Sequence, residues 1–178
     1  MKGIFKQSVA FLGYHAIYSV LSLIFMLPFS SLIYYNDGVT RPIGGIFYTF
    51  VILLLYLPCI YSNMWKLGKN HTKKVSEVKP NPIIALKISI ISEIPTVIIF
   101  ILMVIFHLKN PDGFNLFYTI YKVWQAIYIG IIDIAKPLYV VIIFVPVLFA
   151  YLGYVAGSKN FEFAEKYIYP LMFKKKKS

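Results

Sequence analysis

The sequence predicts an all-α, polytopic membrane protein with four transmembrane helices, and three observations lead to this fold class. The chain of 178 residues is 59% hydrophobic and only 14% charged, which is more apolar side chain than one soluble core of this length can bury. Four stretches come close to the ~20 apolar residues that cross a bilayer, at 9–35, 44–62, 88–106 and 138–156. The basic residues are divided unevenly between the loops. We therefore expect one membrane domain over 1–178.

The basic residues indicate that both termini lie in the cytoplasm, because Lys and Arg next to membrane helices are retained on the cytoplasmic side during insertion. With four spans and a cytoplasmic N-terminus, fourteen of the eighteen basic residues lie inside. The outside receives only Arg41, Lys109, Lys122 and Lys136. Turn-forming residues at 36–38 and 110–113 suit the outer connections. We expect a multi-pass protein of the cytoplasmic membrane.

The stretch 114–134 is apolar enough to resemble a fifth span, but we expect it to lie on the outer surface as an amphipathic helix. A fifth crossing would place Lys122 and Asp133 at membrane depth and would move the lysine-rich tail outside. At helical spacing, one side carries only apolar and aromatic residues: Phe117, Ile120, Tyr121, Trp124, Ile127, Tyr128 and Ile131. The opposite side carries the polar residues Asn115, Thr119, Lys122 and Asp133. This pattern is typical of a helix at the membrane interface.

The tail over 158–178 is expected to be a short, basic, amphipathic segment on the inner surface. It ends in four consecutive lysines, Lys174, Lys175, Lys176 and Lys177. Such a cationic end suits the headgroups of anionic inner-leaflet lipids, which we expect as partners together with the bilayer itself. The alternative is that these lysines serve only as a topology anchor.

Glu93 is the one carboxylate inside an apolar span, which makes it the first candidate for chemistry. An ionisable group at membrane depth is costly unless it is paired, neutralised or hydrated. Ser89, Ser92 and Thr96 share its helix face through three- and four-residue spacings. Pro95 leaves a nearby backbone carbonyl without its usual partner. This face is expected to point into the bundle rather than at lipid.

The first span carries a matching polar stripe, in which His15 is the ionisable member. The stripe consists of Ser8, His15, Ser19 and Ser22, at spacings of seven, four and three residues. His15 and Glu93 each lie about 9 Å past the inner end of their span, so that they can meet at one depth as a proton or cation site. The alternative is that Glu93 reaches the inner headgroups, or hydrogen-bonds Ser89 and a tyrosine only to fix the register of the bundle.

Helix-packing features accompany these polar residues. Gly153 and Gly157 form a Gly-x-x-x-Gly pair at the inner end of the fourth span, which permits close approach of a helix in this chain or in a partner of a homodimer or larger membrane complex. Every span also contains a proline: Pro28, Pro58, Pro95 and Pro146. Broken helices line many transporter pathways, yet proline is frequent in membrane helices generally, and no repeat relates the two halves of the chain.

No metal, cofactor or nucleic acid is expected. His15, His71 and His107 are far apart in predicted depth or side, and Cys59 is the only cysteine. The sequence contains no Gly-rich phosphate loop, His-Glu-x-x-His or Gly-x-Ser-x-Gly motif. The net charge of +11 comes mostly from residues that flank spans, without a soluble basic and aromatic module for nucleic acid.

Two short motifs resemble those of a bacterial protein family. Trp65, Gly68 and Lys69 form a Trp-x-x-Gly-Lys pattern after the second span, and Gly153, Gly157 and Lys159 mark the exit from the fourth. The chain resembles small multi-span membrane proteins of low-GC Gram-positive bacteria, which often show these patterns before a short basic tail. Here Ser158 stands where tyrosine is usual. The resemblance covers most of the chain and implies a fold and a compartment, but no activity.

Three functions remain open from the sequence. The first is a non-enzymatic subunit or accessory bundle, whose basic inner loop and tail contact lipid headgroups or a cytoplasmic partner. The second is a small transporter or permease component that uses Glu93 and His15 as an intramembrane coupling site. The third is a membrane enzyme acting on lipid, which would need several polar groups converging at the inner interface. The lack of a catalytic motif favours a non-enzymatic role.

Overall fold

A computed structural model describes residues 2–34, 41–73, 79–109, 116–132, 134 and 138–161 of the chain. Its helices, in chain order, are α1 (Lys2–Ile33), α2 (Pro42–His71), α3 (Ile83–Lys109), α4 (Leu116–Trp124), the short 3-10 helix η1 (Ala126–Tyr128) and α5 (Leu138–Ser158). The expected all-α fold is confirmed, since these described ranges contain helices and turns but no strand.

Four of the helices are long and apolar enough to cross a membrane, so the chain is a multi-pass integral membrane protein. α1, α2, α3 and α5 have 32, 30, 27 and 21 residues. They coincide with the four expected spans but extend beyond the apolar stretches. α2, for example, continues to His71, past the expected limit at 62. The polar extension of α2 beyond residue 62 remains helical because Gly68 within it packs on α5.

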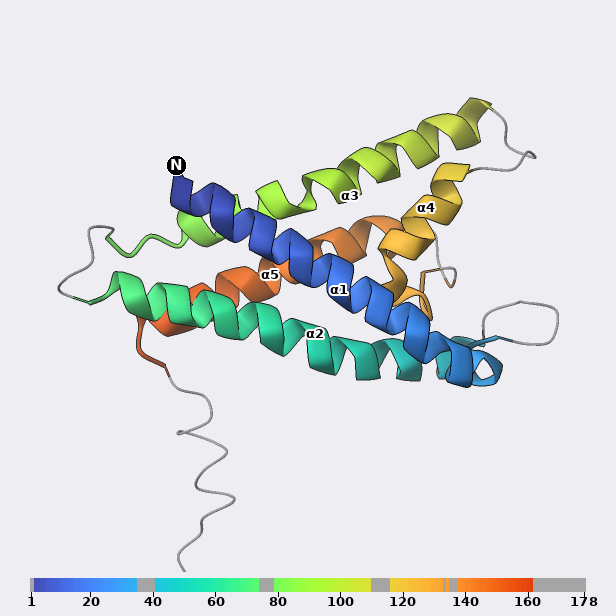
Figure 1. Cartoon of the computed structure of the whole chain (residues 1–178), viewed down its shortest axis with the longest axis horizontal. Helices are drawn as coiled ribbons and strands as arrows, with labels where there is room; N and C mark the ends of the chain where they lie inside the picture. The colour runs from blue at the N-terminus through green and yellow to red at the C-terminus, as the bar shows by residue number, and fades with distance from the viewer. Residues whose placement is uncertain are drawn as a thin grey trace, which may run out of the picture.

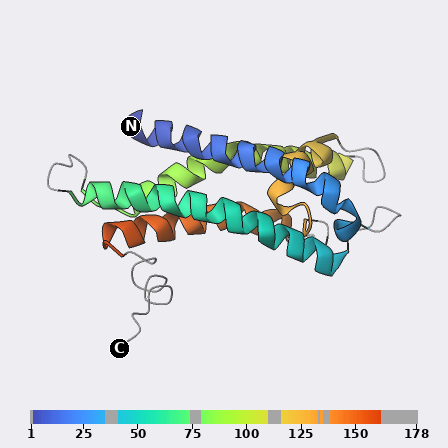
Figure 2. The ribbon, with the colours of Figure 1, turned by 60° about the horizontal axis from the view of Figure 1, so that its bottom comes forward.

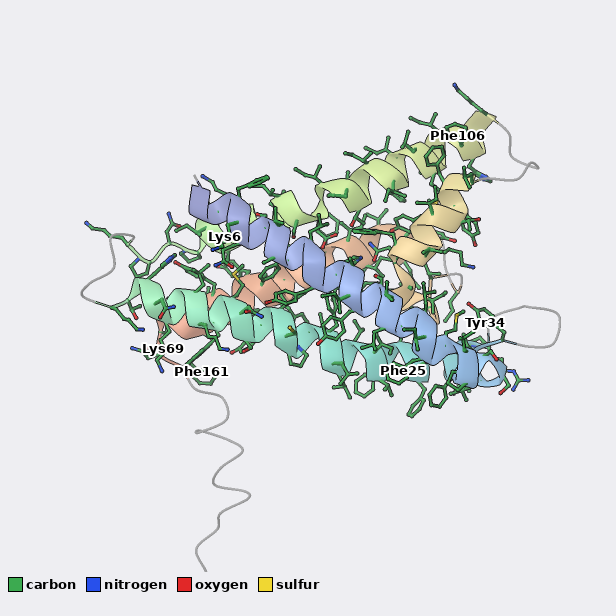
Figure 3. The ribbon with its side chains drawn as sticks, viewed as in Figure 1. Lys6, Phe25, Tyr34, Lys69, Phe106 and Phe161 are labelled. Atoms are coloured by element: carbon green, nitrogen blue, oxygen red, sulfur yellow. The ribbon has the colours of Figure 1, made fainter. Side chains whose placement is uncertain are left out.

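The helices run alternately between the two ends of the bundle. The terminal end is the one where α1 begins and α5 ends, and the far end is the one where α1 ends and α2 begins (Figure 1). α2 lies along α5, and α1 packs on both α2 and α3 (Figure 2). Lys6, Lys69 and Phe161 lie toward the terminal end, whereas Phe25, Tyr34 and Phe106 lie toward the far end (Figure 3).

Apolar side chains cover the outside of the bundle, and tyrosines occupy much of its interior. Exposed residues such as Ile17, Phe50, Ile98 and Phe144 lie on all four long helices, where the hydrocarbon of a bilayer would meet them. The largest fully buried side chains are instead Tyr56, Tyr121, Tyr128 and Tyr154. A buried tyrosine hydroxyl usually has a hydrogen-bond partner, so this interior combines large apolar rings with polar contacts.

Three glycines bring α2 and α5 into backbone contact. A Cβ atom at Gly157 would stand 2.0 Å from the carbonyl oxygen of Trp65, and one at Gly153 would stand 2.5 Å from a carbonyl oxygen of α2. From the other side, a Cβ atom at Gly68 would stand 2.3 Å from the carbonyl oxygen of Tyr154. Real Cβ atoms do not tolerate such distances, so all three positions require glycine for this packing. The Gly-x-x-x-Gly pair therefore serves a contact within the chain.

Side chains at the terminal end join α2, α3 and α5. The buried hydroxyl of Tyr154 on α5 lies 2.7 Å from His71 Nδ1 at the end of α2, and it accepts a hydrogen bond of 3.1 Å from the backbone N–H of Asn81 just before α3. The indole N–H of Trp65 on α2 donates to the carbonyl of Phe161 just after α5, at 2.8 Å. These contacts fix the helix ends that the glycines bring together.

The segment after α3 folds back into the bundle. α4 runs antiparallel to α3 from the far end, with the rings of Phe117 and Phe106 4.6 Å apart and Trp124 bonded to Thr96 near the middle of α3. Figure 1 shows α4 directed from the end of α3 toward α1. The chain then turns through η1, and residues 125–130 and 132 are buried. We call residues 116–132 the re-entrant segment.

The expectation of one continuous amphipathic helix over 114–134 is therefore wrong for the described residues 116–132. α4 has only 9 residues, and the backbone that follows it packs against α1 and α2. A Cβ atom at Gly45 of α2 would stand 1.9 Å from the carbonyl oxygen of Gly130, so the return of the segment also needs glycine contact. Within α4 the periodicity predicted correctly that Tyr121 is buried and Thr119 exposed, but Ile120, expected on the side of Tyr121, is exposed as well.

Several expected features fall outside the described residues. These are the outer turns at 36–38 and 110–113, the polar residues Asn115, Asp133 and Lys136, and the basic tail from 162 onward with Lys174, Lys175, Lys176 and Lys177.

Replacing Gly157 by alanine should destabilise the protein, because the new methyl group meets backbone that no rotamer change can move. We expect a loss of about 1–3 kcal/mol in the free energy of unfolding, the usual range for overpacking. Gly13→Ala in α1 is the matched control, because a Cβ atom there meets nothing within 4 Å. That control should be neutral or stabilising, by up to about 1 kcal/mol. Reversible unfolding of the purified protein measures both, and equal losses in the two variants would contradict the α2–α5 contact.

Candidate functional site

The polar stripe of α1 faces the interior of the bundle. Ser8, His15, Ser19 and Ser22 are all buried. Ser8 donates a hydrogen bond of 3.0 Å to the carbonyl of Ile88 on α3. The other three contact α2 and the re-entrant segment. The spacing in the sequence thus predicted one buried face correctly, but its main partner is the backbone of the re-entrant segment.

Two carbonyl groups of the re-entrant segment accept hydrogen bonds from this stripe, and Ala126 also accepts one from the backbone N–H of Ile129. The carbonyl oxygen of Trp124 accepts from Ser19 Oγ at 2.6 Å and from His15 Nε2 at 3.0 Å. The carbonyl oxygen of Ala126 accepts from Ser22 Oγ at 2.7 Å. Non-helical backbone at membrane depth is tolerated only where its polar groups are satisfied. The stripe therefore stabilises the break between α4 and η1.

The contacts of His15 define which of its ring nitrogens carries a proton. Its Nε2 faces the carbonyl of Trp124, which can only accept, so Nε2 is protonated. Its Nδ1 lies 3.1 Å from the hydroxyl of Tyr56 on α2. In the neutral ring Nδ1 is an acceptor, and the hydroxyl of Tyr56 donates to it. His15 thus links α1 to α2 and to the tip of the re-entrant segment.

Glu93 is buried near the middle of the bundle with few polar partners. Its side chain is 5% exposed. The hydroxyl of Thr96 provides one hydrogen bond to the carboxyl group of Glu93, while Glu93 Oε2 has no hydrogen-bond partner among the described residues. Tyr56, Tyr121 and Tyr128 surround it closely enough for electrostatic interaction. A carboxylate held this way is incompletely compensated for its loss of water.

Trp124 connects the two residues that the sequence paired. No hydrogen bond joins His15 to Glu93, because both ring nitrogens of His15 are engaged elsewhere. The indole N–H of Trp124 donates to Thr96 Oγ1 at 2.8 Å, which leaves the proton of Thr96 for Glu93. The carbonyl of the same tryptophan accepts from His15. The expected contact is therefore replaced by a link through Trp124 and Thr96.

Ser89 and Ser92 share the face of Glu93 but bond within their own helix. Ser89 Oγ donates to the carbonyl of Ala85 at 2.8 Å, and Ser92 Oγ donates to the carbonyl of Ser89 at 2.7 Å. Such bonds to the preceding turn are common for serine in apolar helices. Of the polar residues predicted around Glu93, only Thr96 reaches its carboxyl group.

The tip of the re-entrant segment lies near the middle of the bundle. Trp124 is level with Tyr56 because both bond His15, and Gly130 is level with Gly45 because their backbones touch. Eleven residues separate Gly45 from Tyr56 along α2. At ~1.5 Å per residue this corresponds to about 16 Å, roughly half of a ~30 Å hydrocarbon core.

We call the residues around His15, Glu93 and Thr96 the polar cluster. The sequence analysis missed four of its members: Tyr56, Trp124, Gln125 and Tyr128. The aromatic residues carried no signal, since apolar packing explains them equally well. Gln125 did carry one, because it is the only amide in the otherwise apolar run 123–132. A buried amide needs polar partners, and Gln125 is 1% exposed.

Comparisons with other proteins do not identify the site. Within the described ranges, no three His, Cys, Asp or Glu side chains gather as metal ligands. Searches of protein-family models, curated proteins and solved structures find no match to this chain. The resemblance inferred from Trp65, Gly68 and Lys69 therefore stays a prediction, and the function must be argued from the geometry of the cluster.

Proposed function

We propose that the chain is a small transporter or permease component, in which Glu93 exchanges a proton or a small cation with water. One observation carries this proposal: Glu93 is buried within an apolar span, with an oxygen atom that no group of the described residues bonds. A carboxyl group in this position needs a proton, a cation or water to compensate its burial. Release and rebinding of such a proton or cation is the elementary step of coupled transport.

The re-entrant segment supports the same proposal. Broken helices that end at the midplane are typical of transporter binding sites, because irregular backbone there provides polar groups that a continuous helix would hide. Here α4 ends at Trp124, and the break is held by side-chain hydrogen bonds from α1. Displacement of this tip would change the partners of His15 directly and those of Glu93 through Thr96. His15 thus takes part in coupling without contacting Glu93.

The competing proposal is a non-enzymatic accessory bundle, in which buried polar residues only fix the helix register. The bonding of Ser89 and Ser92 within α3 supports it, because these hydroxyl groups donate their protons to their own helix. The two proposals differ in whether Glu93 exchanges with water.

We also propose that both termini lie in the cytoplasm. Six exposed lysines of the described residues lie at the terminal end, namely Lys6, Lys66, Lys73, Lys79, Lys87 and Lys159. At the far end, the exposed basic residue of the described chain is Lys109. This asymmetry follows the positive-inside rule and would place the basic end against anionic inner-leaflet lipids.

Infrared difference spectroscopy of the protein in lipid should show reversible protonation of Glu93. We expect a carboxyl C=O band that appears and disappears as the pH is stepped, because exchange requires contact with water. The band should be absent in Glu93→Gln and retained in Thr49→Val, which removes a buried hydroxyl from α2, two turns away from Tyr56. A spectrum in which no band depends on Glu93 would favour the accessory bundle.

Thiol labelling of intact cells tests the orientation. In a Cys59→Ser background, Lys109→Cys and Lys159→Cys place single thiols at exposed positions of opposite ends. A membrane-impermeant maleimide should label the first variant in intact cells and the second only after the membrane is permeabilised. The reverse pattern would place the terminal end outside.

A further inference from the structure

We infer that Glu93, Gln125 and Tyr128 form a binding site for one desolvated monovalent metal cation. This inference rests on the proposed function, because it takes Glu93 as the group that exchanges its proton or cation. It names a monovalent metal cation as what the site binds. Its starting point is a set of oxygen atoms, Glu93 Oε2, Gln125 Oε1 and the Tyr128 hydroxyl, which are buried and lack hydrogen-bond partners.

The three side chains converge from two elements. Gln125 directly follows Trp124, whose indole N–H lies 2.8 Å from Thr96 Oγ1, and Thr96 in turn bonds the carboxyl group of Glu93 on α3. Tyr128, three residues further on, interacts electrostatically with Glu93. We therefore place the buried amide of Gln125, which lies between Trp124 and Tyr128 in the chain, beside the same carboxyl group.

The chemistry of these atoms selects a positively charged occupant. An ionised carboxylate oxygen and an amide oxygen can only accept hydrogen bonds, so these two atoms cannot bond each other, and the donors nearby are the amide N–H groups of Gln125 and the hydroxyl of Tyr128. The hydroxyl of Tyr128 can turn a lone pair toward the same point. Buried oxygen atoms without donors are costly unless a donor or a cation lies among them. Carboxylate, carbonyl and hydroxyl oxygens are the ligands that hard metal cations prefer.

The charge balance favours a monovalent ion. Glu93 is the only acidic residue in the described part of the chain. One positive charge would neutralise it, whereas a divalent ion would leave a net charge in a medium of low dielectric constant. Thr96 holds the other side of the carboxyl group through its hydrogen bond, and Trp124 in turn orients Thr96. The carboxyl group of Glu93 is thus held in position before a cation binds.

Cation titration of the purified protein in lipid nanodiscs tests this site. NaCl or KCl replaces N-methyl-D-glucamine chloride at constant pH and ionic strength, and the readouts are the unfolding temperature and the fluorescence of Trp124 in a Trp65→Phe background. We expect a saturable change with at least one of the two metal ions. Glu93→Gln should abolish it, and Gln125→Met and Tyr128→Phe should each weaken the apparent affinity about tenfold, as the loss of one hydrogen-bond-strength contact to a charge does.

Thr49→Val is the matched control, because Thr49 also carries a buried hydroxyl without a partner but lies outside the cluster. It should keep the full response. The inference is overturned if Na⁺, K⁺ and N-methyl-D-glucamine act alike, or if the Gln125 and Tyr128 variants respond as the unmodified protein does. If Glu93 is protonated reversibly but no cation response is found, the cation site is overturned and the proposed function stands in its proton form. If neither protonation nor a cation response is found, the cation site and the proposed function are both overturned.

Discussion

The structure depends on the hydrogen bonds that α1 gives to the carbonyl of Trp124. Without the donors of Ser19 and His15, that carbonyl would be an unpaired polar group in the middle of a hydrophobic bundle, and α4 could not end there. Because it does end there, η1 can turn and Gly130 can return past Gly45. The same break brings Trp124 to Thr96, which bonds Glu93, and Tyr128 within electrostatic reach of Glu93. One capped carbonyl thus determines both the topology of the second half and the composition of the polar cluster.

Much of the fold could be predicted from the sequence because lipid imposes a length and a polarity on each span. The four long helices contain the apolar stretches at 44–62, 88–106 and 138–156, and α1 covers nearly all of 9–35. The segment 114–134 could not be predicted, because its periodicity describes only α4. What ends α4 is a set of donors on α1, 105 residues away in the sequence. Local patterns do not report such long-range partners.

The candidate site was predicted in part for the same reason. A carboxylate and a histidine within apolar spans are conspicuous, so Glu93 and His15 were identified, as was the hydroxyl of Thr96. Their connection was not, since Trp124 links them through its indole N–H and its backbone carbonyl. Tyr56 and Tyr128 belong to the cluster only by virtue of the packing. The pairing of two ionisable residues by depth alone therefore found the right region but the wrong contact.

The glycine contacts between α2 and α5 hold these two helices together as one rigid unit. Where backbone touches backbone, as at Gly68, Gly153 and Gly157, two helices cannot slide past each other by changing rotamers, so this pair acts as a rigid spine. α1 is attached to the middle of the bundle through side chains such as His15, Ser19 and Ser22, whose hydrogen bonds can be exchanged one at a time. At the far end, by contrast, backbone meets backbone where Gly44 of α2 approaches Leu32 and Gly45 approaches Gly130. Any rearrangement that opens the interior to water will therefore exchange these side-chain bonds of α1 while the glycine contacts of α2 stay in place.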